Sequence, residues 1–355
     1  MRSCWRRGWR GSRRVLRRWS RRGRCGWSCR IRVVTDNNTV GSTLPNPFIL
    51  ERADPQILRH EGRYFFTATV PAYDRIVLRT ADTLAGLREA PESTIWVKHP
   101  EGAMGSHIWA PELHRVDGAW YVYFAAGEAD TATGDVWKIR MYVLENRADD
   151  PLSGEWTEKG QIRTPIDSFS LDATTFAHGG RQYLCWAQHD PGLPGSNTSL
   201  FLAALANPWT IEGDPVELSR PELDWETVRF AVNEGPYALV RNGKVFITYS
   251  ASGTGAEYCV GLLSADADAD LLDPASWSKH PEPVFATSAA AGIFGPGHNA
   301  FTVDEDGRDL LVFHARSYEE IVGDPLDNPD RHCRVQPFGW RADGTPDFGE
   351  PLPEA

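Results

Sequence analysis

Four ionisable side chains recur at a nearly fixed distance before a glycine, and their types suit proton transfer. They are Asp54, Asp172, Glu234 and His298, and each stands eight or nine residues before a glycine that opens an aromatic or apolar segment. A repeat that returns the same turn around an axis also returns the same position to that axis, so we expect the four side chains to converge. Neighbouring carboxyl and imidazole groups are the usual partners in general acid–base catalysis.

These side chains are positioned by a fivefold repeat of short strands. The repeat glycines are separated by steps of 56, 62, 63 and 64 residues, and they are Gly62, Gly118, Gly180, Gly243 and Gly307. Four short strands in about 60 residues is the pattern of a β-propeller blade. We therefore predict an all-β fold, a single-domain five-bladed β-propeller over residues 44–355. The first strand of each blade should line the axis and carry the ionisable residue at its beginning, with Trp109 and Ala110 at the equivalent place in the second blade.

The first 32 residues differ in composition from the rest of the chain. They hold 13 Arg and no acidic residue, and the total charge of −11 leaves −24 for residues 33–355. An acidic body argues against nucleic acid as a partner. We interpret residues 1–32 as a basic tail that is disordered and does not fold, with the hypothesis that the native start is Val33 or Val34. A basic nucleic-acid arm is the alternative.

Location is inferred from what the sequence lacks. No apolar stretch of roughly 7–15 residues marks a secretory signal in residues 1–32, so the default expectation is a cytoplasmic protein. No run approaches the length of a membrane span, and we expect no membrane partner.

Three segments around these acids resemble the motifs of glycoside hydrolase family 43. They are Ala53-Asp54-Pro55 before Gly62, Ser170-Leu171-Asp172-Ala173 before Gly180, and Asn233-Glu234-Gly235-Pro236 before Gly243. The segment His107–Glu112 also fits the family's second blade, and the likeness runs from about Asn46 to Pro351. The resemblance implies a five-bladed propeller that acts on α-L-arabinofuranosides or β-D-xylosides. The segments 46–69 and 108–114 look most like the exo-acting α-L-arabinofuranosidases.

The resemblance also implies a role for each acid. Asp54 would be the general base, Glu234 the general acid, and Asp172 a third carboxylate that raises the pKa of Glu234 and orients it. Members of the family invert the anomeric carbon, so the carboxyl groups of Asp54 and Glu234 should lie roughly 6.5–9.5 Å apart with a water molecule between Asp54 and the sugar.

Other residues are candidates for binding. Trp109 would stack on a sugar at the pocket mouth, unless it is buried in the blade core, and Phe230 and Asn233 would border the pocket. Arg334 resembles a late family arginine near the substrate, although an ordinary ion-paired arginine is the alternative. No cofactor is expected to be required, but His298 could hold a water molecule or a structural calcium at the propeller axis, or be a hydrogen-bonded core histidine.

The prediction is therefore an inverting glycosidase that removes terminal α-L-arabinofuranosyl residues from arabinan or arabino-oligosaccharides. A β-xylosidase or an endo-arabinanase of the same family is the alternative within the class, with arabinose- or xylose-containing saccharides as partners. A non-catalytic carbohydrate-binding propeller would be expected to lack one of the three acids, and a protein-interaction propeller has no use for converging carboxylates.

Overall fold

A tight turn at each repeat glycine sets the geometry of the blades. The five glycines all have positive φ, between 74° and 82°. In the first four blades the preceding residue also has positive φ (Glu61, Asp117, Gly179 and Asn242). Two consecutive residues with positive φ make the type I′ turn, whose twist matches that of an antiparallel hairpin. The repeat glycines therefore connect the first and second strands of each blade, as the sequence predicted.

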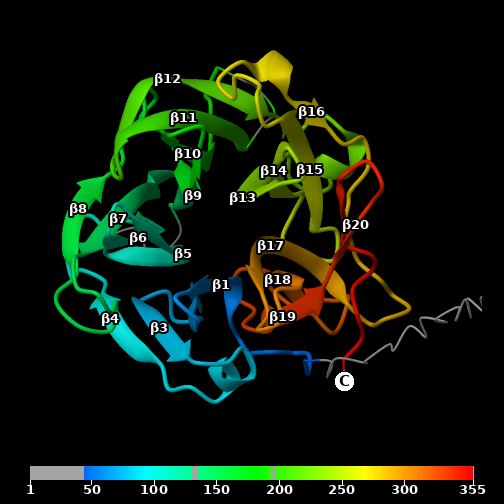
Figure 1. Cartoon of the computed structure of the whole chain (residues 1–355), viewed down its shortest axis with the longest axis horizontal. Helices are drawn as coiled ribbons and strands as arrows, with labels where there is room; N and C mark the ends of the chain where they lie inside the picture. The colour runs from blue at the N-terminus through cyan, green and yellow to red at the C-terminus, as the bar shows by residue number, and fades with distance from the viewer. Residues whose placement is uncertain (1–43, 130–134, 193–194, 196, 355) are drawn as a thin grey trace, which may run out of the picture. The chain divides into compact units, whose positions relative to one another are not determined.

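The computed structural model describes residues 44–129, 135–192, 195 and 197–354, and these form a five-bladed β-propeller (Figure 1). The tail predicted for residues 1–32 lies outside the described residues. Blade one contains β1 (Ala53–His60), β2 (Arg63–Thr69), β3 (Arg75–Ala81) and β4 (Ser93–Val97). Blade two contains β5 (Ser106–Val116), β6 (Ala119–Gly127), β7 (Arg140–Asn146) and β8 (Thr157–Gln161).

The remaining blades follow the same antiparallel order from the axis outward. Blade three contains β9 (Ser170–His178), β10 (Arg181–Gln188), β11 (Ser199–Asn207) and β12 (Thr210–Ser219). Blade four contains β13 (Asn233–Arg241), β14 (Lys244–Ala251), β15 (Cys259–Asp266) and β16 (Ser278–Lys279). Blade five contains β17 (Phe294–Val303), β18 (Asp309–Arg316) and β19 (His332–Pro337).

Short elements complete the fold. A hairpin of β20 (Gly339–Trp340) and β21 (Pro346–Asp347) follows blade five. The helical elements that lie wholly within the described residues are single 3₁₀ turns, η1 (Ala85–Arg88), η3 (Val136–Lys138), η4 (Asp224–Glu226) and η5 (Pro274–Ser276). Within the described ranges, no helix has the length and apolar character needed to cross a membrane.

Apolar side chains fill the junctions between neighbouring blades. Blades one and two, for example, share a buried cluster that contains Phe65, Leu78, Trp120 and Phe124. Similar clusters lie between blades two and three, three and four, four and five, and five and one. Both faces of each small sheet are therefore buried, and the axis is left to the polar side chains of the innermost strands.

The beginning of the described chain closes the ring. The N–H of Phe48 donates to the carbonyl of Cys333 in β19 at 2.7 Å, and Ile49 forms an antiparallel bridge with the same residue. The Asn46 amide bonds both the N–H and the carbonyl of Val335. Residues 46–49 thus act as the outer strand of blade five, which otherwise has three strands.

Candidate active site

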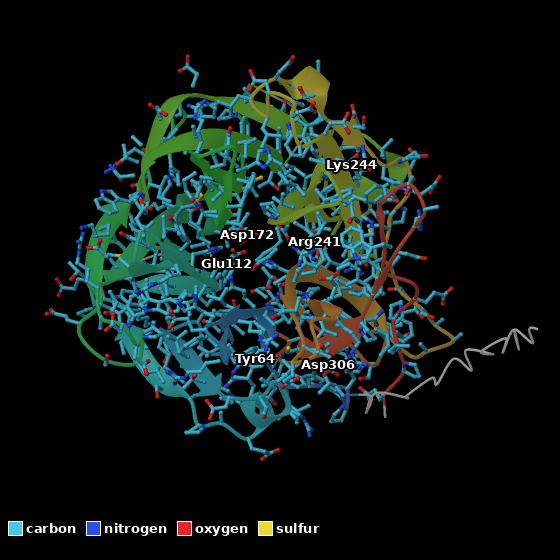
Figure 2. The ribbon with its side chains drawn as sticks, viewed as in Figure 1. Tyr64, Glu112, Asp172, Arg241, Lys244 and Asp306 are labelled. Atoms are coloured by element: carbon cyan, nitrogen blue, oxygen red, sulfur yellow. The ribbon has the colours of Figure 1, made fainter. Side chains whose placement is uncertain are left out.

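The five inner strands share one irregularity near their beginning. The pairing register shifts there, and a residue at an equivalent place in each strand takes the left-handed conformation, with φ between 45° and 57°: Asp54, Ala110, Asp172, Gly235 and His298. A β-bulge of this kind bends the strand and redirects a side chain. For residues other than glycine it costs on the order of 1 kcal/mol, and such strain concentrates at functional sites. In Figure 2, Asp172 lies near the centre of the ring.

The bulges are held by the neighbouring blades. In four of them the N–H of the bulge residue donates to an acceptor from the preceding blade around the ring. The donor–acceptor pairs are Ala110–Thr69, Gly235–Asp172, His298–Ser250 and Asp54–His314, at 2.7, 3.0, 2.7 and 3.0 Å. Four of the five inner strands are therefore positioned by the preceding blade as well as by their own sheet.

Asp54 is surrounded by donors and positive charge. The hydroxyl of Thr69 donates to its Oδ2 at 2.6 Å, and its Oδ1 lies 3.3 Å from Nδ1 of His298 and 3.5 Å from Nη1 of Arg331. Burial alone would raise the pKa of Asp54, but His298 and Arg331 outweigh burial and hold that pKa well below its usual range. Asp54 is therefore ionised and able to accept a proton.

His314 contacts Asp54 from the other side in its neutral form. Its Nδ1 accepts the N–H of Asp54, and burial lowers the pKa of His314 to about 3. The 3.3 Å separation between this Nδ1 and Oδ1 of Asp54 is therefore not an ion pair, because the ring nitrogen is already an acceptor.

His298 bridges two of the acids. Its Nδ1 lies 3.3 Å from Oδ1 of Asp54 and 4.0 Å from Oδ2 of Asp172. Burial lowers the pKa of His298, but Asp54, Asp172 and Glu234 outweigh burial and raise that pKa overall. The neighbouring acids therefore favour the charged form of the imidazole.

The described residues around His298 do not by themselves form a metal-binding cluster. Within the described part of the chain, no group of three or more His, Cys, Asp or Glu residues is arranged to hold a metal ion. Calcium takes six to eight oxygen ligands, and water molecules can be among them. The structural calcium expected at the axis, and the alternative of a core histidine, therefore stay predictions.

Glu234 and Asp172 lie in an environment that raises their pKa values, in contrast to Asp54. Burial raises the pKa of Glu234 to about 7, with a further contribution from the negative charge of Asp172. Burial also raises the pKa of Asp172, against the pull of His298. Tyr258 donates to Oε1 of Glu234 at 2.8 Å. Glu234 therefore retains a proton at a pH where Asp54 has lost its own, which is the division of roles between a general acid and a general base.

These groups face one cavity of about 720 Å³. Asp54, Asp172, Glu234, His298 and Arg331 all line it. A cavity of this size accommodates a small ligand. The three acids therefore converge on one cavity, as predicted. Asp54, Asp172 and Glu234 come from blades one, three and four, and blade five supplies His298.

Aromatic and apolar side chains form the rest of the lining. Trp109, which is half-buried, contacts Tyr73 and His107 edge to face at ring distances of 5.6 and 5.0 Å. Its indole N–H is buried and has no partner among the described residues. Phe230 lies at the mouth with 56 % of its surface exposed, and Trp137 is 48 % exposed. Such rings suit the apolar faces of a sugar.

Asn233 does not contact the cavity, which corrects its predicted role. Its side chain is fully buried, donates to Oε1 of Glu226 at 3.0 Å and accepts from Ser219 at 2.6 Å. Because alternate residues of a strand point to opposite faces, Asn233 points away when its neighbour Glu234 faces the cavity. Asn233 therefore anchors the beginning of β13.

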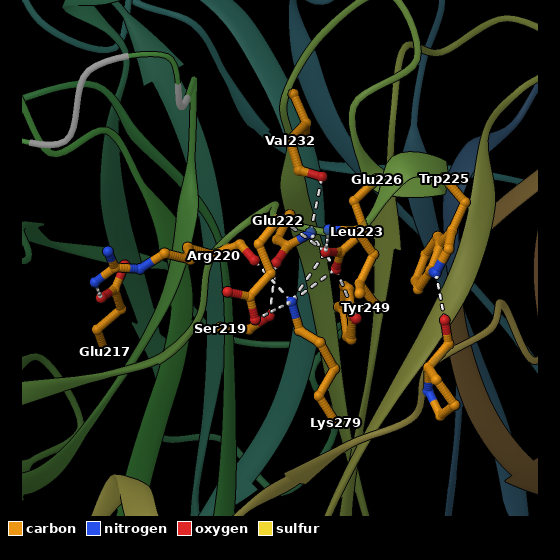
Figure 3. A network of polar contacts seen from close by, with 12 residues as sticks. Glu217, Ser219, Arg220, Glu222, Leu223, Trp225, Glu226, Val232, Tyr249 and Lys279 are labelled. Carbon is orange, nitrogen blue, oxygen red and sulfur yellow. Dashed lines mark hydrogen bonds and ion pairs between the residues drawn. The ribbon is translucent and has the colours of Figure 1, made fainter.

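The anchor is a buried polar network around Glu226 (Figure 3). Oε1 of Glu226 accepts from Tyr249 at 2.8 Å and Lys279 at 2.9 Å, and Oε2 accepts the N–H groups of Glu222 and Leu223, each at 2.9 Å. Glu226 belongs to η4, which leads into the segment 228–232 at the cavity wall.

Arg334 is likewise placed away from the cavity, and Arg331 takes the position expected for it. Arg334 is fully buried in β19, where its guanidinium pairs with Glu354 at 2.6 Å and contacts Ser317. Arg331 precedes β19, lines the cavity and bonds Tyr73. Its Nε is buried without a partner among the described residues. The sequence did not indicate Arg331, because Arg331 and Arg334 are only three residues apart. Arg334 lies within the paired strand β19 and Arg331 lies just before it, and this difference is set by the fold.

The comparisons with known proteins agree with this geometry. The family model of the glycosyl hydrolases family 43 matches residues 44–346. The chain belongs to this family. It is 61 % identical over 312 residues to an extracellular exo-α-(1→5)-L-arabinofuranosidase of Streptomyces avermitilis. The aligned region covers 87 % of the chain and 64 % of that protein.

Two further relatives have similar names. An extracellular exo-α-(1→5)-L-arabinofuranosidase of Streptomyces chartreusis is 61 % identical over 282 residues, covering 79 % of the chain and 84 % of that protein. The crystal structure of an α-L-arabinofuranosidase from Lactobacillus brevis superposes with a TM-score of 0.85 at 52 % identity, covering 88 % of the chain and 98 % of that structure. The chain thus spans just under two thirds of the Streptomyces avermitilis relative and almost all of the solved structure.

The cytoplasmic location expected from the sequence is wrong. Both Streptomyces relatives are named extracellular, at 61 % identity. The expectation depended on the absence of a signal-like stretch, and such an absence does not determine location.

Proposed function

We propose that this chain is an inverting exo-acting α-L-arabinofuranosidase that releases terminal arabinofuranosyl residues from arabinan or arabino-oligosaccharides. The observation that carries the proposal is the opposite protonation of two acids on one cavity, with Asp54 ionised beside His298 and Arg331 and Glu234 protonated beside Asp172. The names of the relatives support arabinofuranose as the sugar and the exo mode of action.

The reaction follows from these protonation states. Asp54 accepts a proton from a water molecule as the water oxygen bonds the anomeric carbon. The glycosidic C–O bond breaks at the same time, and the proton of Glu234 passes to the leaving oxygen. The products are a free sugar of inverted configuration and a shortened saccharide. Asp54 ends protonated and Glu234 ionised, and exchange with solvent restores both acids.

Asp172 and His298 maintain the difference between the two acids. The negative charge of Asp172 opposes ionisation of Glu234, and the positive charge of His298 favours ionisation of Asp54. Asp172 also accepts the N–H of Gly235, the residue after Glu234, and so orients the general acid through its backbone. We assign Arg331 and Trp109 to substrate binding, because each has a buried N–H without a partner and lines the cavity.

Replacing Glu234 with Gln tests the acid role. Activity on arabino-oligosaccharides should fall by about 10²–10⁴-fold, the usual contribution of a general acid. Activity on an aryl α-L-arabinofuranoside with an acidic phenol should be nearly retained, because that leaving group needs no proton. Glu145→Gln is the matched control, since Glu145 is a buried, hydrogen-bonded glutamate outside the cavity lining. Equal losses on both substrates would contradict the assignment.

Product analysis tests the substrate and the stereochemistry. A panel of aryl α-L-arabinofuranoside, aryl β-D-xyloside and linear arabinan, with products resolved by chain length, distinguishes the exo-arabinofuranosidase from a xylosidase and from an endo enzyme. Proton NMR of the first-formed sugar should show the inverted anomer. Retention of configuration would reject Asp54 as a general base.

A further inference from the structure

Tyr258 contacts the general acid directly and is almost completely buried. It precedes β15, and its phenol donates to Oε1 of Glu234 at 2.8 Å. Only 1 % of its surface is exposed, and burial together with the negative charge of Glu234 raises the pKa of Tyr258 well above its usual value. The phenol therefore keeps its proton and acts as a donor over the whole working pH range.

The direction of this hydrogen bond follows from the chemistry of the two groups. An ionised carboxylate can only accept a hydrogen bond, so the phenol of Tyr258 is the donor to Glu234. When the carboxyl group of Glu234 is protonated, the same hydrogen bond leaves its proton on the other oxygen.

The ring of Tyr258 is clamped on two sides. It stacks on His314 with an interplanar angle of 1° and a centroid distance of 5.6 Å. A Cβ added at Gly297 would lie 2.2 Å from Cε1 of Tyr258 and 2.3 Å from Cδ1. Gly297 is not in the left-handed region, so its backbone conformation does not require glycine, and the space occupied by the Tyr258 ring does.

We propose that Tyr258 is a positioning residue for the general acid: its hydrogen bond to Oε1 of Glu234 leaves Oε2 as the oxygen that carries the proton and presents it to the glycosidic oxygen. This inference rests on the proposed function of Glu234. Because the same ring packs on His314, which accepts the N–H of Asp54, Tyr258 also fixes the distance between the acid and the base.

Tyr258→Phe removes the donor and keeps the ring. Asp172, Asp54 and His298 also face Glu234 and are unchanged by this substitution. The phenol stabilises the ionised carboxylate, so its loss should raise the pKa of Glu234. Because a protonated Glu234 is required, the alkaline limb of kcat/KM should move upward, by about one to two pH units for a hydrogen bond to a charged group. We also expect about a tenfold fall in kcat on arabino-oligosaccharides with little change in KM, as for a misplaced catalytic group.

Tyr64→Phe is the matched control, because Tyr64 is fully buried and its hydroxyl has no partner among the described residues. Its pH profile should equal that of the wild type. Gly297→Ala should displace the ring and reproduce the kcat loss of Tyr258→Phe. If Gly297→Ala does not fold, Tyr258→Phe decides alone. An unmoved alkaline limb in Tyr258→Phe, or an equal shift in Tyr64→Phe, would overturn the proposal.

A second readout separates this proposal from the proposed function. The protein labelled with ¹³C at glutamate carboxyl carbons is titrated by NMR, and Glu234 is assigned by the signal lost in Glu234→Gln. An upward shift of this titration in Tyr258→Phe supports the hydrogen bond even if the wild type hydrolyses no arabinofuranoside. An active enzyme whose Glu234 titrates identically in both forms would refute the role of Tyr258 alone.

Discussion

Glu226→Gln should destabilise the propeller although Glu226 lies outside the cavity lining. The carboxylate is fully buried and bonded by five donors: the N–H groups of Glu222 and Leu223 and the side chains of Asn233, Tyr249 and Lys279. An amide has the same shape but turns an acceptor oxygen into a donor that faces other donors. It also removes the buried negative charge that pairs with Lys279, and the side chain of Lys279 is itself only 15 % exposed.

The magnitude follows from the burial of the pair. Breaking a buried ion pair by removing one partner costs about 3–5 kcal/mol. Large domains lose about 2 °C in Tm per kcal/mol, so a loss of about 4 kcal/mol corresponds to a fall of roughly 8 °C. Urea unfolding monitored by tryptophan fluorescence measures the free energy directly. The double variant with Lys279→Met should recover part of the loss, since it removes an ammonium that has lost its buried partner and keeps only the exposed Glu222, 3.8 Å away, as an ion-pair partner.

The loss should also depend on pH. Burial raises the pKa of Glu226, but the N–H donors of Glu222 and Leu223 and the charge of Lys279 outweigh burial and lower that pKa below 4.5. A lowered pKa stabilises the fold above the unfolded value, and this contribution disappears as pH falls below about 4.5. The wild type and Glu226→Gln should therefore differ fully at pH 7 and converge in acid. A difference under 1 kcal/mol at pH 7, or one that persists unchanged below pH 4, would refute the reasoning.

Three other predictions concern the cavity. Glu234→Gln should stabilise the fold at pH 7 by at most about 3 kcal/mol. The pKa of Glu234 is raised from 4.5 to about 7, so the stabilising contribution of its protonated form is lost as pH rises through that range. Urea unfolding should therefore show no gain for this variant at pH 4.5. Thr69→Val should cost about 1–3 kcal/mol in unfolding free energy by leaving the Ala110 N–H unpaired, and should move the acid limb of kcat/KM upward by removing a donor to Asp54. Phe230→Ala should change stability by less than about 0.5 kcal/mol but raise KM for oligosaccharides, and an unchanged KM would remove Phe230 from the binding surface.

The sequence predicted the inner part of each blade and the residues that line the axis. Gly62 and its equivalents enforce the hairpin turn, and an aromatic strand follows each one, so local chemistry determined the register. The outer strands were harder to predict. β8 (Thr157–Gln161) is polar and has no buried residue, and β16 has two residues, so neither shows a buried periodicity.

The site was predictable where the repeat carried the information. Asp54, Asp172 and His298 occupy the same bulge in three blades, and Glu234 directly precedes the bulge residue Gly235 in a fourth. Arg331 and Tyr258 lie in connections between strands, outside the repeat pattern. Their orientation depends on long-range contacts, such as the bond between Arg331 and Tyr73, that no local pattern encodes.

The outer strand of blade five has a consequence for how activity appears during folding. Asn46 bonds Val335, so this blade joins parts of the chain 289 positions apart. Contacts of such separation form late and slowly. His298, from this last blade, then meets Asp54, from the first, only when the two ends of the propeller have been joined. We therefore expect catalytic competence to arise in a single late step during refolding, with no fractional turnover from shorter assemblies of blades.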